Sequence, residues 1–197
     1  KELLKRYSIA RIPFITVNTI EKSRTLNMLK EVSEELSLPF CVHSYSKGIY
    51  DLSSSKVIND DRSVYGAIDY MNEQMNRKQN MTIIFTDVPD LSTETEDTKL
   101  FFSLVNLANE TGGVVIVLYE GAVWNQLQRS GMIVKVDLPD EEEMYSIIKE
   151  YINDYRAEIP IEWDDMDIRE AASTLSGVTR IEAENVVAAL IANGAIK

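Results

Sequence analysis

Lys22 and Ser23 form the residue pair that closes the phosphate-binding loop of many nucleotide-binding proteins. Such a loop reads Gly-x-x-x-x-Gly-Lys-Ser/Thr, because only glycines let successive backbone N–H groups curl round a phosphate. Aligned on this pair, the two glycine positions hold Thr16 and Glu21, a β-branched residue and a carboxylate that would repel the anion. We therefore expect Lys22 and Ser23 to form the exposed first turn of a helix, and a nucleotide site built on them to be degenerate.

Asp87 ends an apolar run over residues 81–86. A strand of this kind places a carboxylate at the edge of a sheet, where it holds the Mg²⁺ of a bound nucleotide. The next residue is normally a glutamate that activates water, and here it is Val88, which cannot accept a proton. Two independent parts of a hydrolytic site are thus missing, and we expect no intrinsic nucleotide hydrolysis.

The remaining candidates for chemistry are weaker. His43 is the only histidine and Cys41 the only cysteine, so the chain has no internal disulfide and no cysteine-rich zinc site. They share one face of a predicted strand, which favours a role in the core over one in catalysis. The acidic stretch 163–167 lacks the glycine and distal glutamate of an EF-hand loop, so we interpret it as a solvated helix start and predict no metal site.

The elements that would position these residues alternate between strand and helix over the first 138 residues. A loop with one glycine and three serines is expected over 47–61. Apolar runs separated by helical periodicity predict a doubly wound α/β domain of three layers, with a five-stranded parallel sheet between helices. The predicted strands cover residues 13–19, 39–45, 81–86, 114–118 and 133–138.

After Pro139 the pattern becomes purely helical. Asp140 with Glu143 resembles an N-cap, and Thr179 with Glu182 resembles a capping box. We predict an α/β core over 1–138 and a small all-helical lid over 139–197. The charge changes at the same place, since residues 1–136 carry 17 acids and 15 bases whereas 137–197 carry 15 acids and 5 bases.

Composition excludes several classes of function. The net charge of −12 argues against direct nucleic-acid binding, which needs clustered lysines and arginines to neutralise phosphates. No apolar run approaches the roughly 20 residues of a membrane span, and the N-terminus lacks the hydrophobic stretch of a signal peptide. We expect a soluble, cytoplasmic protein, and a chain that starts without methionine is expected to be a fragment of a longer one.

The order of strands, helices and helical lid resembles the AAA family of ATPases over nearly the whole chain. Residues 81–87 look like its Walker B strand. The segment 127–132, followed by a strand and Leu138-Pro139-Asp140, looks like its Arg-Pro-Gly-Arg, strand, Leu-Pro-Asp stretch. Residues 175–184 look like the lid helix that reaches back over the nucleotide.

One subfamily is especially similar. In the tandem AAA proteins of plastids, cyanobacteria and other bacteria, a degenerate first module precedes an active one. The segments 17–21, 44–48 and 177–185 look like those of that first module.

The resemblance assigns roles to two further positions, Arg129 and Arg180. Arg129 corresponds to an arginine at a subunit edge that can act in trans on a neighbour's γ-phosphate, although the family's second arginine is here Met132. Arg180 corresponds to a lid arginine that senses nucleotide. The degenerate site implied is therefore Lys22, Ser23, Asp87 and Arg180.

We accordingly expect a degenerate AAA+ module with a structural or regulatory role in an ATPase assembly. Its partners would be an active AAA module in the same or a neighbouring chain, or further copies of itself. It would hold no cofactor, with ATP and Mg²⁺ bound elsewhere in the parent protein. The alternatives are an ATPase with a non-standard phosphate loop, at Lys22 or residues 53–56, and an interaction adaptor that uses the acidic lid.

Overall fold

The computed structural model describes residues 1–158 and 160–192. The chain divides into two compact units, Lys1–Val136 and Asp137–Lys197, and each is described by itself. Within the described residues, no helix is long and apolar enough to cross a membrane.

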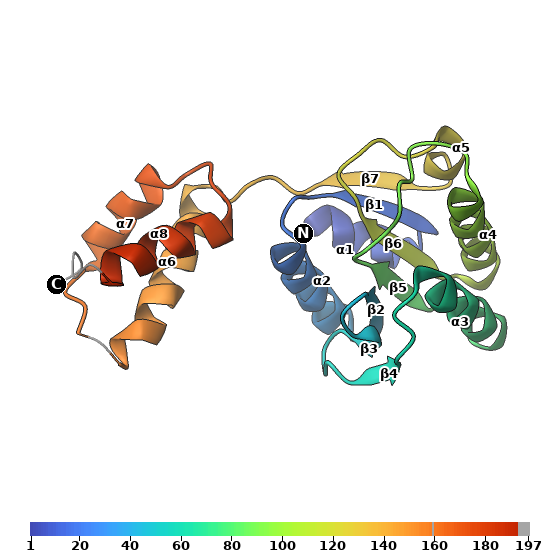
Figure 1. The fold of residues 1–197 in the computed structure, drawn as a ribbon, viewed down its shortest axis with the longest axis horizontal. Coiled ribbons are helices and arrows are strands. Elements are labelled where there is room, and N and C mark those ends of the chain that lie inside the picture. Colours follow the sequence, from blue (N-terminus) through green and yellow to red (C-terminus); the bar gives the residue numbers. More distant parts are fainter. Residues whose placement is uncertain (159, 193–197) are drawn as a thin grey trace. The chain divides into compact units, whose positions relative to one another are not determined.

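The first unit is an α/β domain, as predicted, built on one sheet of order β4-β3-β2-β5-β6-β1-β7 (Figure 1). The five predicted strands are all present and parallel. They lie next to one another in the sheet, in the order β2-β5-β6-β1-β7. Their bounds are β1 Phe14–Asn18, β2 Phe40–Ser44, β5 Thr82–Phe85, β6 Val114–Leu118 and β7 Met132–Lys135.

The prediction of five strands was wrong in number, because two more strands extend the sheet beyond β2. The predicted loop over 47–61 contains β3 (Gly48–Asp51) and β4 (Val57–Asn59), and both pair antiparallel. Gly48 has φ +77°, and a Cβ there would lie 2.4 Å from the Asn59 carbonyl oxygen, so the crowded turn requires glycine. The apolar residues of β3 between polar loop residues were too few to reveal the strand in the sequence.

Helices cover both faces of the sheet and give three layers. Side chains of α1 and α2 pack in a core on one face, and those of α3, α4 and α5 pack on the other. The short α1 was not predicted, and it is fixed by the fully buried Leu4. The helices are α1 Glu2–Ile9, α2 Lys22–Leu36, α3 Val64–Arg77, α4 Glu96–Thr111 and α5 Asn125–Gln128.

The second unit is all helical. It consists of α6 (Glu141–Arg156), α7 (Asp165–Thr174) and α8 (Arg180–Ala192). The predicted helix starts are confirmed: Asp140 accepts a hydrogen bond from Glu143 N (2.8 Å), and Thr179 accepts one from Glu182 N (3.1 Å). Its small core contains Met144, Ile148, Ile152, Ile168, Ala172, Ala183 and Val187.

Candidate functional site

The carboxyl ends of the parallel strands meet at one edge of the sheet, and the structure brings Lys22 and Asp87 together there. The Lys22 ammonium lies 3.2 Å from Asp87 Oδ1, and the Tyr45 N–H donates to Asp87 Oδ2 at 2.9 Å. Partial burial would raise the pKa of Asp87, but the Tyr45 hydrogen bond and the Lys22 charge outweigh it and hold that pKa below its usual value. The carboxylate therefore stays charged and has a partner on each oxygen.

The connection from β1 to α2 is short and closed. Thr16, at the first glycine position of the loop pattern, is a buried residue inside β1 and pairs with strands on both sides. Only residues 19–21 separate the strand from the helix. The Thr19 hydroxyl accepts hydrogen bonds from Glu21 N and from the Thr25 hydroxyl, each at 2.9 Å. The connection between β1 and α2 is thus three residues long, and the Thr19 hydroxyl bonds to two groups within it or beside it.

A buried ion pair completes this connection. Glu21, at the second glycine position, lies 2.8 Å from Arg24, and both side chains are less than a tenth exposed. A carboxylate and its counter-ion therefore occupy the space beside the helix start. An incoming phosphate would have to compete with Glu21 for Arg24.

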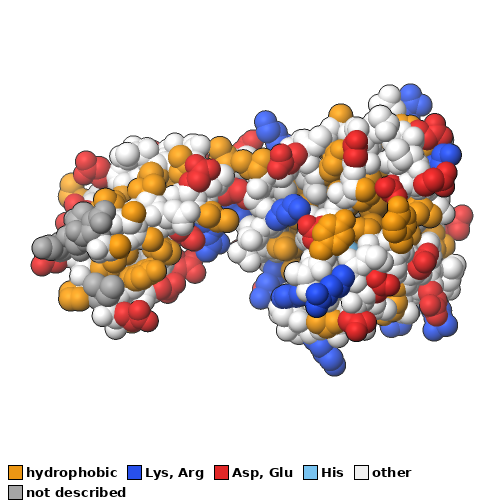
Figure 2. All heavy atoms as spheres, in the orientation of Figure 1, with side chains coloured by type: hydrophobic (Ala, Val, Ile, Leu, Met, Phe, Trp, Pro, Cys, Tyr) orange, Lys and Arg blue, Asp and Glu red, His pale blue; other side chains and the backbone are white. Residues whose placement is uncertain are grey.

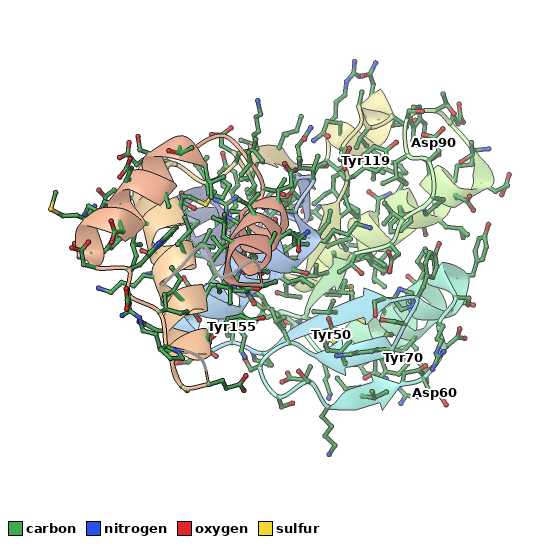
Figure 3. All side chains as sticks on the ribbon, turned by 60° about the vertical axis from the view of Figure 1, so that its left-hand side comes forward. Tyr50, Asp60, Tyr70, Asp90, Tyr119 and Tyr155 are labelled. Atoms are coloured by element: carbon green, nitrogen blue, oxygen red, sulfur yellow. The ribbon has the colours of Figure 1, made fainter. Side chains whose placement is uncertain are left out.

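The loops after β5 and β6 carry side chains that bind each other. Val88, in the place of the water-activating glutamate, packs against the apolar core on the α3 and α4 face. The Tyr119 hydroxyl donates to Asp90 Oδ1 at 3.0 Å and accepts from Leu91 N at 3.2 Å (Figure 3). Val88 therefore makes an apolar contact where a general base would stand, and the nearby polar groups of Tyr119 and Asp90 bind each other.

Comparison with known proteins identifies the family of the first unit. Residues 1–136 match the family described as SpoVK-like AAA ATPase, N-terminal domain. The chain belongs to this family. No curated protein sequence matches it.

Solved AAA structures share the fold at low identity. A chain of the HORMA:CdnC:Trip13 complex from E. coli MS115-1 superposes with a TM-score of 0.57 at 12% identity, covering 91% of this chain and 67% of that one. A DNA replication initiation factor gives 0.59 at 15% identity, covering 98% and 60%, and C. elegans PCH-2 gives 0.57 at 13%, covering 94% and 59%. The chain thus spans about 60% of the length of these last two neighbours.

The AAA resemblance also assigned roles to Ser23, Arg129 and Arg180. Ser23 is exposed in the first turn of α2. Arg129 is exposed just after α5, and its guanidinium makes no hydrogen bond or ion pair with the residues that the structure describes. Arg180 belongs to the second unit, where its Nε lies 2.8 Å from Glu184.

His43 is a buried core residue of β2. Its Nε2 lies 3.2 Å from the Asp61 carbonyl oxygen, and its ring packs against Phe85. Its Nδ1 has no hydrogen-bond partner among the described residues. Burial lowers the pKa of His43 and raises the pKa of the nearby Cys41 thiol, so both groups are neutral at pH 7 and neither is activated for chemistry.

Two further segments form local turns. In the alternative phosphate loop at 53–56, Ser54 N and its hydroxyl both donate to Asp51 Oδ2 at 2.9 Å, so the turn closes round a carboxylate that repels anions. The acidic stretch 163–167 starts a helix, as predicted, through reciprocal bonds between Asp164 and Asp167. Over residues 1–158 and 160–192, no group of three His, Cys, Asp or Glu is placed to hold a metal ion.

Proposed function

We propose that this AAA module neither binds nor hydrolyses nucleotide and acts as a structural and regulatory part of an ATPase assembly. The observation that carries the proposal is the Lys22–Asp87 ion pair beside the closed β1–α2 connection. Lys22 neutralises the carboxylate that would otherwise hold Mg²⁺, and Glu21 replaces the glycine that would approach the phosphate.

Nucleotide binding would require several changes at once. Lys22 would have to leave Asp87, the hydrogen bonds of Thr19 would have to open, and the Glu21–Arg24 pair would have to separate. The last step exposes a buried charge pair, and breaking such a pair costs about 3 kcal/mol. The bound phosphate would then lie close to the Glu21 carboxylate, and the two anions would repel each other. Phosphate binding would therefore offset little of the free energy lost by breaking the Glu21–Arg24 pair.

The partners that we propose are an active AAA module of the same or a neighbouring chain, and further copies of this module. ATP and Mg²⁺ would be bound and used by the active module. Arg129 is exposed and has no partner among the described residues, which supports a role toward the nucleotide of a neighbour. A solved structural neighbour is described in a complex, HORMA:CdnC:Trip13, which is consistent with work through partner proteins.

Calorimetric titration of this chain with ATP and ADP in the presence of Mg²⁺ tests the proposal, with phosphate release measured on the same preparation. We expect neither heat of binding at millimolar nucleotide nor turnover. Saturable binding would overturn the proposal. Its loss in Lys22→Ala, with the exposed control Lys78→Ala unchanged, would reinstate an ATPase with a non-standard phosphate loop at Lys22.

A further inference from the structure

A small cavity lies beside the closed edge, where the end of β2 approaches the first turns of α3 and α4. Its volume is about 200 Å³, and its walls come from four separate parts of the first unit. Ligand pockets for drug-sized molecules are usually about 300 Å³ or more, so this one fits a single side chain better than a nucleotide. The lining residues are Tyr45, Ser63, Val64, Tyr65, Ile68, Pro89, Asp97 and Phe101.

The rim of this tyrosine pocket combines aromatic rings with one carboxylate. Tyr45 and Tyr65 are 54% and 55% exposed, which is high for large aromatic side chains. In Figure 2 hydrophobic side chains gather with acidic ones over the end of β5 and the start of α3. Val64, Ile68 and Phe101 form a buried apolar floor.

Asp97 supplies the charge of the pocket. The Tyr65 hydroxyl donates to Asp97 Oδ1, and Oδ2 has no partner among the residues that the structure describes. The hydrogen bond and charge of Asp97 raise the pKa of Tyr65, and Glu96 and Tyr45 add to this effect. These groups therefore lie close together, and no lysine or arginine lines the cavity.

The chemistry of these walls selects a cation that is flat and partly apolar. The faces of tyrosine rings attract cations, and a desolvated contact of this kind is stronger than an exposed one. A guanidinium stacks on aromatic rings and offers parallel N–H donors to a carboxylate, whereas an ammonium is more strongly hydrated and binds as a point charge. An arginine stem would also cover the apolar floor.

We infer that this tyrosine pocket binds an arginine side chain presented by a segment of a partner protein. The guanidinium would stack against Tyr45 and Tyr65 and donate to Asp97 Oδ2. Its lining residues do not include Lys22 or Asp87, although the Tyr45 backbone N–H donates to Asp87 Oδ2, so arginine binding and nucleotide binding are tested by separate titrations. In the proposed assembly, the tyrosine pocket would be one specific point of contact with a partner protein.

Peptide titration followed by ¹H–¹⁵N NMR tests the inference on the intact chain. The probe is acetyl-Gly-Arg-Gly-amide, compared with the same peptide containing lysine or the neutral isostere citrulline. We expect saturable shifts confined to the pocket, with a dissociation constant of about 1 mM for one side chain. Lysine should bind more weakly, and citrulline should bind at least about fivefold more weakly because it lacks the charge.

Variants then assign the contacts. Asp97→Asn should weaken arginine binding at least about fivefold, and Tyr65→Ala should weaken it similarly, through loss of the charge and of the ring face. The matched control is Glu110→Gln, which makes the same charge change at the exposed far end of α4 and should have no effect. Equal binding of arginine and citrulline, no shifts up to about 20 mM peptide, or an Asp97→Asn variant that still binds would each overturn the inference. None of these outcomes bears on the nucleotide titration.

Discussion

Two neighbouring parts of the same sheet edge differ in how their polar groups are used. At the β1–α2 connection, Thr19, Glu21 and Arg24 bind one another, and Lys22 binds Asp87. At the tyrosine pocket, Asp97 keeps one oxygen without a described partner, and two aromatic rings face solvent. Polar groups that already have partners must lose them before a ligand can bind, whereas the pocket pays no such cost.

We propose that this difference lets an AAA module lose one ligand and still recognise another. The residues of the β1–α2 connection stabilise the fold, because their polar groups bind one another. We propose that a phosphate would have to replace these contacts in order to bind. At the pocket, the rim residues Tyr45 and Tyr65 are exposed and leave surface for a partner. The following predictions test that division, beginning with the substitution of largest expected effect.

Arg24→Met should lower the free energy of unfolding by about 3 kcal/mol, because it removes the ion pair between Arg24 and the buried Glu21 carboxylate. Urea unfolding followed by circular dichroism measures the change. The double variant Glu21→Gln with Arg24→Met should recover at least half of the loss, because it removes both charges. A loss below about 1 kcal/mol for Arg24→Met would show that the connection is not held by this pair.

Asp87→Ala should cost about 1 to 2 kcal/mol, because it removes the acceptor of the Tyr45 N–H as well as the partner of Lys22. Asp87→Asn retains an acceptor and should cost less. Thermal unfolding of the two variants side by side gives the difference. If Asp87→Ala were as stable as the parent chain, the closed edge would not depend on this carboxylate.

His43 should make stability depend on pH between about 7 and 5. Burial lowers its pKa in the folded chain below the ordinary value of about 6.5, so the unfolded chain binds the proton first as the pH falls. Its contribution is complete above pH 6.5 and is lost below it, with a slope of at most about 1.4 kcal/mol per pH unit for one proton.

The imidazole proton signal measures this pKa directly, because the chain has a single histidine. A His43→Gln variant should lose the slope between pH 7 and 5, while slopes below pH 5 from carboxylates should remain. An imidazole pKa above 6.5 would contradict the prediction and would indicate a stabilising partner for Nδ1.

Lys22→Ala should have the smallest effect, below about 0.5 kcal/mol, since the Lys22 side chain is half exposed and surface ion pairs contribute little. High salt should reduce even this difference. Chemical unfolding at low and high salt provides the comparison. A loss as large as that of Arg24→Met would mean that Lys22, and not the Glu21–Arg24 pair, closes the edge.

The strands that run through the core could be predicted from the sequence because they are continuous apolar runs. The lid helices could be predicted from their caps, such as Asp140 and Thr179, which act within four residues. The strands β3 and β4 were missed because they are short and their pairing is set by contacts with β2. The replacement of the two glycines of a phosphate loop by Thr16 and Glu21 can be read directly from the sequence.

The tertiary contacts of the site could not be predicted in the same way. Lys22 was expected to be an exposed residue in the first helical turn, and it is, but its partner Asp87 lies 65 residues further along the chain. The tyrosine pocket was missed altogether. Tyr45, Tyr65 and Asp97 lie on three elements, and each alone resembles an ordinary surface residue. Only the assembled sheet edge places them round one cavity.

The outer strand β4 limits how this module can join other chains. It is three residues long, pairs on one side with β3, and lies between the charged residues Lys56 and Asp60. Short strands with charged flanks are poor templates for backbone pairing, even though Val57 and Ile58 are partly exposed. At this end of the sheet, neighbours would then be selected by the identity of individual side chains. Recognition of this kind can be lost, or redirected to a different partner, by a single substitution.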